Sequence, residues 1–171
     1  MTSLKKGGEK ENKNNPQYLP TDSMKNNMNK FIYRPIKFNR ITQIFGENKT
    51  DYSKLGMLGH NGLDMATWNG TPIYHSGDYM GYMKTEIDAM GGIGVDIYSN
   101  TPQIDGKRIK LRYWHLKQVV GWDGKEVRPG QLIGFADNTG FSTGDHLYFD
   151  LKCVDENDKT SRSIRKPGRN H

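Results

Sequence analysis

The sequence predicts an all-β protein built from short antiparallel strands. Only 33% of the residues are hydrophobic and 20 are glycine, so short strands joined by glycine turns fit better than long apolar helical stripes. Runs of aromatic and β-branched residues alternate with turn signals, while long helical patterns and internal repeats are missing. The length of 171 residues suits one domain.

The expected strands follow one another from near Phe31, where FIYRPIKFNRITQIFG begins and Pro35 marks an edge or a turn. In residues 108–116, apolar and basic side chains alternate, as in a strand with one buried face. The remaining expected strands cover residues 71–75, 79–87, 94–98, 131–136 and 146–154. Turns are expected at Asn69-Gly70, Asp105-Gly106, Asp123-Gly124 and Pro129-Gly130.

The positive charge is concentrated at the two ends of the chain. The net charge is +6, although the middle of the sequence is slightly acidic. Residues 1–30 lack apolar periodicity and are expected to form a disordered basic tail, followed by a folded domain over 31–154 and a basic tail over 155–171. Such tails bind anionic polymers, such as nucleic acid or cell-wall glycopolymers, or are simply solvated. No nucleic-acid binding is expected of the folded domain.

Export and disulfide signals are missing from the sequence. No apolar run approaches the roughly 18 residues of a transmembrane span, and the first 30 residues lack the apolar stretch of a signal peptide. The protein is therefore expected not to export itself by that route. Its one cysteine, Cys153, excludes an internal disulfide. Strand alternation places Cys153 with Leu147, Phe149 and Leu151 on the core face, as a small core residue rather than a nucleophile.

Three histidines occur in settings that suit chemistry. His60 and Asp64 lie in GHNGLDMA, where the glycines on both sides indicate a loop or a short strand crossing. One imidazole with one carboxylate suits zinc, although this spacing is common by chance. His115 ends the alternating strand in RYWHL, and His146 begins the last strand after NTGFSTGD. These side chains could converge on one groove, or they could be hydrogen-bonded structural histidines. For His75, an ordinary structural role is expected.

Several motifs together resemble those of the lysostaphin-type, LytM-like zinc endopeptidases. GHNGLDMATWNGTPIY is similar to the first metal motif of that family, and ITQIFGEN to the strand that precedes it. YWHL resembles the family's Tyr-x-His-Leu, and VRPGQLIGFADNTGFSTGDHLYFDL its final segment. The motifs occur in order from about residue 41 to residue 151. The resemblance implies antiparallel sheets with a long open groove and the site on its floor.

The resemblance also implies an activity, the hydrolysis of peptide bonds in bacterial peptidoglycan. By the family pattern, His60 and Asp64 would bind zinc, and His115 and His146 would be catalytic. Zinc would polarise the scissile carbonyl and acidify a bound water. The histidines would move the proton, and Tyr113 would help to line the site.

Tyr148 stands where the family has its third zinc ligand, a histidine. Its hydroxyl lies further from the backbone and must approach phenolate to bind a metal well. Tyr148 could still act as a ligand, Asp150 or water could complete the shell, or zinc binding could be lost. Asp145 replaces the usual proline and adds a negative charge beside the site. Tyr113, Asp145 and Asp150 are therefore expected in the substrate groove.

Three functions follow from these observations. The first is a zinc-dependent endopeptidase of peptidoglycan cross-links. The second is a catalytically degenerate module that binds the cell wall. The third, compatible with the first, is a component of a bacteriophage tail or lysis system, with other virion proteins as partners, because a wall-cutting domain without an export signal needs another route.

Overall fold

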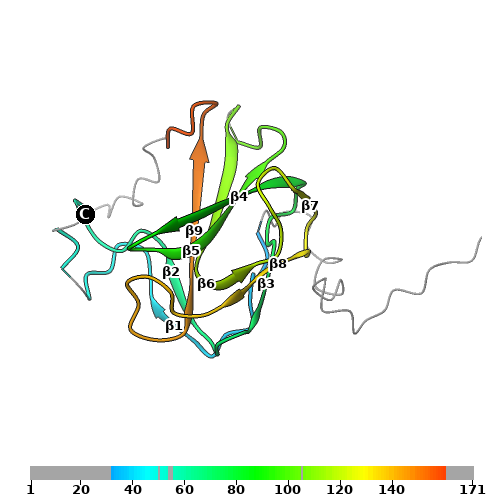
Figure 1. Cartoon of the computed structure of the whole chain (residues 1–171). Helices are drawn as coiled ribbons and strands as arrows, with labels where there is room; N and C mark the ends of the chain where they lie inside the picture. The colour runs from blue at the N-terminus through cyan, green and yellow to red at the C-terminus, as the bar shows by residue number, and fades with distance from the viewer. Residues whose placement is uncertain (1–31, 50, 54–55, 105, 161–171) are drawn as a thin grey trace, which may run out of the picture.

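The part of the chain that the structure describes is built almost entirely from strands, as predicted. The computed structural model describes residues 32–49, 51–53, 56–104 and 106–160 (Figure 1). The expected tail at residues 1–30 and most of the tail at 155–171 lie outside the described residues. The strands are β1 (Arg40–Gln43), β2 (Leu63–Ala66), β3 (Pro72–Tyr74), β4 (Gly81–Asp88), β5 (Gly92–Ser99), β6 (Arg108–Val119), β7 (Glu126–Val127), β8 (Leu132–Ala136) and β9 (His146–Val154).

A single nine-stranded antiparallel sheet replaces the separate sheets expected from the sequence. Its main path runs β1-β2-β9-β6-β5-β4-β7, and β8 pairs with both β6 and β3. The long strand β6 is the centre of this arrangement (Figure 1). Its first part, Arg108–Trp114, pairs with β9, and its last part, Leu116–Val119, pairs with β8. The pairing partner of β6 therefore changes at His115.

The alternation in β6 separates a core face from a polar face. Ile109, Leu111 and Tyr113 are fully buried, whereas the basic residues between them lie on the opposite face of the sheet. Complete burial of a large apolar side chain stabilises the fold by roughly 1.5–3 kcal/mol. On β9, Leu147 is likewise buried, with Phe149 and Leu151 packed against the same core. Cys153 is a free thiol and is partly buried.

Three parts of the fold were not fully predicted from the sequence. β2 forms where the sequence indicated a loop or a short strand crossing, because it pairs with β1 and β9 on its two sides. The short strand β7 was missed, since its only strand partner is β4. Ordered structure also continues beyond residue 154. Thr160 bridges back to Val154, and the Asp158 carboxylate accepts hydrogen bonds from Tyr98 and Lys110.

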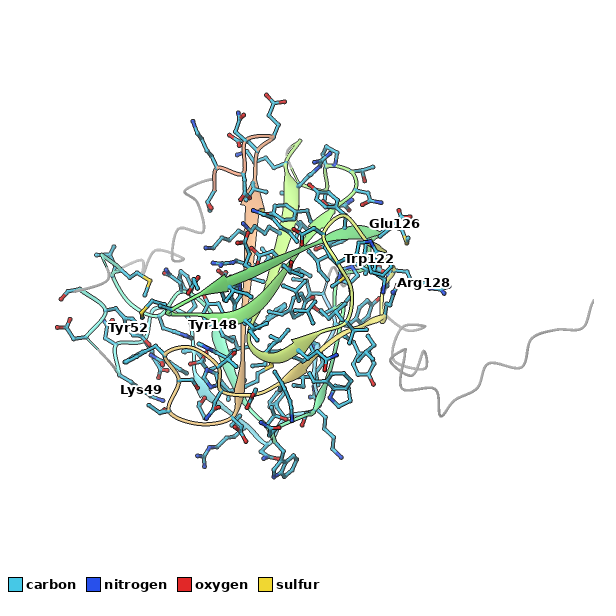
Figure 2. All side chains as sticks on the ribbon, viewed as in Figure 1. Lys49, Tyr52, Trp122, Glu126, Arg128 and Tyr148 are labelled. Carbon is cyan, nitrogen blue, oxygen red and sulfur yellow. The ribbon has the colours of Figure 1, made fainter. Side chains whose placement is uncertain are left out.

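The two ends of the molecule carry different side chains (Figure 2). Lys49, Tyr52 and Tyr148 lie on the left of this view, and Trp122, Glu126 and Arg128 lie on the right. No helix within the described residues has the length and apolar character needed to span a membrane.

Candidate active site

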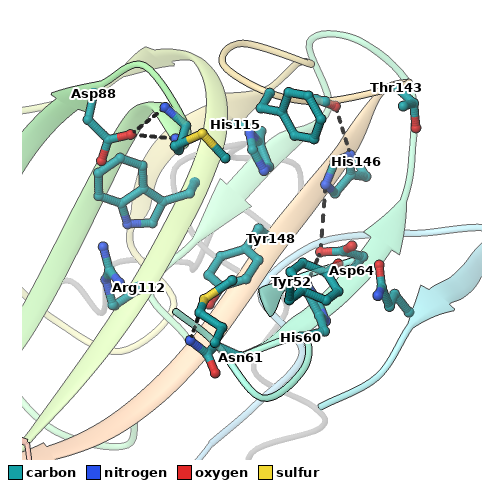
Figure 3. A pocket seen from close by; sticks show the side chains of 17 residues that line it. Tyr52, His60, Asn61, Asp64, Asp88, Arg112, His115, Thr143, His146 and Tyr148 are labelled. Atoms are coloured by element: carbon teal, nitrogen blue, oxygen red, sulfur yellow. Dashed lines mark hydrogen bonds and ion pairs between the residues drawn. The ribbon is translucent and has the colours of Figure 1, made fainter. Parts of the chain in front are cut away.

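A cavity of about 300 Å³ opens on the polar face of the sheet. It is bordered by the loop before β2, the turn between β4 and β5, the middle of β6 and the loop that leads into β9 (Figure 3). The lining residues are Gln43, Tyr52, Met57, His60, Asn61, Asp64, Asp88, Met90, Gly91, Arg112, Trp114, His115, Phe141, Ser142, Thr143, His146 and Tyr148. The histidines that the sequence singled out, His60, His115 and His146, therefore converge here.

His60 and Asp64 form the first half of the site. Backbone hydrogen bonds hold His60 in place, since its N–H donates to the carbonyl of Glu47 and its carbonyl accepts from Gly46. His60 Nε2 lies 3.2 Å from Asp64 Oδ1. Burial lowers the pKa of His60, but the adjacent Asp64 carboxylate outweighs burial, so that the pKa is raised above its usual value.

His115 occupies a bulge in β6 that turns its side chain into the cavity. Its backbone φ of 64° is left-handed, which is uncommon for a residue other than glycine. Gly94 on β5 pairs with Trp114, whereas Ile93 pairs with Leu116, so His115 is the extra residue of the ladder. A regular strand would have kept His115 in the alternation of β6 instead of offering its ring to the cavity.

Hydrogen bonds fix the proton on one nitrogen of His115. Its Nδ1 lies 2.7 Å from the carbonyl oxygen of Thr139, which can only accept, so Nδ1 carries the hydrogen and Nε2 keeps a lone pair. Burial lowers the pKa of His115, and the neighbouring His146 lowers it further, against the opposing hydrogen bond to Thr139. His115 is therefore a neutral imidazole with a free basic nitrogen near pH 7.

His146 has the same arrangement. Its Nδ1 lies 2.8 Å from the carbonyl oxygen of Gly144 and 3.2 Å from the hydroxyl of Ser142, so Nδ1 donates and Nε2 faces Asp64. The distance from His146 Nε2 to Asp64 Oδ1 is 3.6 Å (Figure 3). The ring centroids of His146 and His115 are 4.6 Å apart. The two imidazoles thus present adjacent basic nitrogens to one space.

Tyr148 lies beside His60, but its hydroxyl is engaged elsewhere. Tyr148 pairs with Asp64 across the ladder between β9 and β2, and its ring meets His60 edge-on with centroids 5.4 Å apart. The ring packs over Gly62, where an added Cβ would approach the aromatic carbons to 2.7 Å. The hydroxyl donates to Asp150 Oδ2 at 3.3 Å. Burial and the Asp150 carboxylate raise the pKa of Tyr148 above its usual value, so the phenol is neutral.

These donors fit a zinc ion with two protein ligands. Asp64 Oδ1 is buried without a hydrogen-bond partner among the described residues, as expected for an oxygen that would bind a cation. Donors of a tetrahedral zinc ion with bonds of about 2.0–2.1 Å lie about 3.3 Å apart, close to the separation of His60 and Asp64. A neutral Tyr148 that donates to Asp150 is a poor third ligand. Within the described residues, no three His, Cys, Asp or Glu side chains are grouped to hold a metal ion.

The three expected groove residues are not among those that line the cavity, and this expectation is corrected. Tyr113 is fully buried, and its oxygen bonds the N–H and hydroxyl of Ser76. Asp145 is half-buried outside the cavity lining and accepts a hydrogen bond from the N–H of Asn69. Asp150 is buried next to Tyr148 and pairs with Lys152 at 3.3 Å.

The sequence interpretation missed lining residues that come from distant segments. Tyr52 stands in the loop before His60, with ring centroids 5.9 Å apart. Arg112 and Trp114 precede His115 on β6, and the alternation of that strand already placed Arg112 on its polar face. Phe141 also lines the cavity, and apart from its place in the glycine-rich loop nothing in the sequence indicated this position.

Comparisons with known proteins find relatives in both sequence and fold. The curated peptidoglycan DD-endopeptidase ShyA of Vibrio cholerae is 38% identical over 92 residues, which are 54% of this chain and 20% of ShyA. A crystal structure of a zinc-containing peptidase from Vibrio cholerae superposes with a TM-score of 0.59 at 30% identity, covering 72% of this chain and 36% of that one. The catalytic domain of lysostaphin from Staphylococcus simulans shares the fold, with a TM-score of 0.50 at 24% identity over 74% of this chain and 84% of that one.

The chain spans only 20% to 30% of the length of the first curated relatives that it matches. The sequence pattern of peptidase family M23 matches residues 58–161. This segment contains the cavity histidines and most of the sheet. The chain therefore belongs to peptidase family M23 and is homologous to the LytM-like and lysostaphin-type peptidoglycan endopeptidases.

Proposed function

We propose that the chain is a zinc-dependent endopeptidase that hydrolyses peptide cross-links of bacterial peptidoglycan. The observation that carries this proposal is the convergence of His60, Asp64, His115 and His146 on one cavity. Two of these side chains would hold zinc, and the other two present basic nitrogens beside it. The substrate class is supported by the name of the relative ShyA, a peptidoglycan DD-endopeptidase.

The cavity histidines supply the proton transfers that amide hydrolysis needs. Zinc bound by His60 and Asp64 would polarise the scissile carbonyl and lower the pKa of a bound water. His115 Nε2 carries a lone pair and accepts the proton as the water oxygen joins the carbonyl carbon. His146 Nε2 lies on the same side and is placed to share this role, or to donate to the developing oxyanion once it is protonated. The proton then passes to the leaving amine as the C–N bond breaks.

A second candidate is a wall-binding module without catalysis. It is favoured by Tyr148, whose hydroxyl bonds Asp150 and leaves zinc with two protein ligands instead of the usual three. This candidate predicts that the protein sediments with purified cell walls but releases no new amino termini from them.

Zinc content and wall cleavage, measured on the same preparation, separate the two candidates. The endopeptidase proposal predicts new amino termini from isolated peptidoglycan, inhibition by a chelator and recovery with zinc. His115→Ala is expected to lower the rate by roughly 10²–10⁴-fold, the usual contribution of a general base, with zinc binding unchanged. Zinc-loaded protein that binds walls and leaves them uncut would favour the binding module instead.

The route to the wall is part of the same proposal. A bacteriophage virion or lysis system is proposed to deliver the domain, with other virion proteins as partners, and the basic composition of both ends of the chain supports an adhesive role there. Detection of the protein in purified virions tests this route, and its detection only in phage-free cells would argue against it.

A further inference from the structure

We propose that Arg112 forms a carboxylate-binding subsite in the cavity and selects peptides that carry a free carboxylate close to the scissile bond. This inference rests on the proposed function. It adds a specificity for acidic peptides that neither the motif residues nor the zinc ligands supply.

Among the described residues that line the cavity, Arg112 is the only lysine or arginine. Its side chain is 24% exposed, so it is largely shielded but still reachable from the cavity. Two carboxylates also line the cavity. Asp64 belongs to the proposed zinc-binding pair, and Asp88 accepts hydrogen bonds from the backbone N–H groups of Met90 and Gly91 in a turn. A ligand carboxylate therefore has one lysine or arginine partner among the described lining residues.

A buried anchor orients the Arg112 guanidinium. Arg112 Nε donates to both oxygens of Asp96, at 3.2 and 3.3 Å, and Asp96 is only 1% exposed. Trp114 Nε1 donates to the same carboxylate at 3.0 Å, and the guanidinium lies 4.9 Å from the centroid of the Trp114 ring. Gly94 leaves room for that ring, since an added Cβ there would collide with it. Arg112 is thus held between a carboxylate and an indole.

The terminal nitrogens of Arg112 are left for a ligand. Every hydrogen bond that Arg112 makes to described residues starts from Nε. A guanidinium carries five N–H donors in a rigid fork that matches a carboxylate in a bidentate pair. Because only the Nε edge contacts Asp96, the donors of the terminal nitrogens can point to a bound anion.

Neighbouring acidic and basic side chains leave little net positive charge around the subsite, so recognition depends on the direction of the hydrogen-bond donors. Asp96 also pairs with Lys110 at 3.2 Å, and Asp150, which lies opposite Arg112 in the ladder, pairs with Lys152 at 3.3 Å. The cations and carboxylates of this surface therefore largely compensate one another. A carboxylate would be recognised by the oriented N–H donors of Arg112, which give strong, geometry-dependent hydrogen bonds.

The ladder sets the distance between this subsite and the reacting groups. Arg112 is opposite Asp150, two residues beyond Tyr148 on β9, which corresponds to about 7 Å along a strand. Figure 3 shows Arg112 on one side of Tyr148 and Asp64 with His146 on the other. An extended peptide spans about 3.3–3.6 Å per residue, so the recognised carboxylate lies within roughly two residues of the scissile bond.

Paired peptide ligands test this subsite by binding alone. The probes are synthetic pentapeptides of alanine and glycine with either a free or an amidated terminal carboxyl group, and a third amidated peptide with one internal glutamate. Dissociation constants are measured by calorimetry with the wild type, Arg112→Gln, Arg112→Lys and Arg108→Gln. Arg108 is the matched control, because it is a basic residue on the same face of β6 that does not line the cavity.

The wild type is expected to bind a free carboxylate at least about tenfold more tightly than its amidated counterpart, as for a charged hydrogen bond. Arg112→Gln loses this preference, Arg112→Lys retains part of it, and Arg108→Gln keeps it in full. The terminal and glutamate peptides distinguish the two sources of the carboxylate. The ratio between ligands is taken within one variant, so a change in stability does not imitate the result.

Equal binding of free and amidated peptides by the wild type would overturn the subsite while leaving the proposed function intact. A preference that survives in Arg112→Gln would also overturn it. Wild-type protein that binds none of the peptides, and that leaves peptidoglycan uncut in the assay above, would refute the proposed function and the subsite together.

Discussion

Replacing Tyr148 with histidine tests whether the cavity is a zinc site that lacks one ligand. Tyr148 lies opposite Asp64 in the ladder, and its ring centroid is 5.4 Å from that of His60. Two imidazoles bound through Nε2 to one tetrahedral zinc ion have centroids about 5 Å apart, so an imidazole at position 148 needs little movement to reach a shared metal.

The expected gain follows from the energy of zinc coordination. Four-ligand structural sites bind zinc with about 10–16 kcal/mol, or roughly 3 kcal/mol per ligand. Adding one imidazole to His60 and Asp64 is therefore expected to lower the zinc dissociation constant about 100-fold. Competition with a chromophoric chelator at fixed pH measures this ratio, and the metal content of the purified protein checks the stoichiometry.

Tyr148→Phe is the matched control, because it removes the hydroxyl without adding a donor. It is expected to bind zinc as the wild type does, since the phenol donates to Asp150 and does not act as a ligand. A wild-type protein that binds zinc as tightly as Tyr148→His, together with a loss of affinity in Tyr148→Phe, would show that Tyr148 is a ligand and would refute the reasoning.

Three further predictions concern stability and can be checked by urea denaturation. Burial lowers the pKa of His75 to about 4, so the unfolded state binds a proton at a higher pH than the folded state does. The free energy of unfolding is therefore expected to fall by up to about 3 kcal/mol as the pH decreases from about 6.5 to 4. His75→Gln should flatten this part of the profile, and equal slopes for the two proteins would contradict the assignment. Tyr113→Phe leaves the buried N–H and hydroxyl of Ser76 without their partner and should cost about 1–2 kcal/mol, whereas an unchanged midpoint would mean that other groups replace the bond. Gly94→Ala places a Cβ against the Trp114 ring and should destabilise the fold by about 1–3 kcal/mol with altered tryptophan fluorescence; a wild-type spectrum and midpoint would rule out that collision.

Much of the strand pattern was predictable because it depends on local alternation. The apolar residues of β6 and β9 face the core as their spacing indicated, and glycine turns such as Gly70 and Gly124 adopt the left-handed conformations that their dipeptides predict. β7 was not predictable from two residues, because it is a strand only through its pairing with β4. The number of sheets was also beyond local patterns, since β6 joins what would otherwise be separate sheets by pairing with β9 and then with β8.

The candidate site shows where local patterns are sufficient and where they fail. The motifs identified His60, Asp64, His115 and His146, and the structure brings all of them to one cavity. Tyr113 was misplaced, although its alternation with the buried residues of β6 already assigned it to the core. The resemblance to the family's Tyr-x-His-Leu motif had suggested a place in the site instead.

By itself, the sequence determined the fold class, the order of most strands and the residue types available for zinc and proton transfer, because periodicity and motif spacing are local properties of the chain. Only the tertiary structure decided the orientation of each of these side chains. The left-handed bulge turns His115 into the cavity, and the Tyr148 hydroxyl donates to Asp150. Asp96 and Trp114 hold Arg112 at the cavity wall. These orientations depend on partners from distant strands, and no local pattern encodes which partner a side chain will meet.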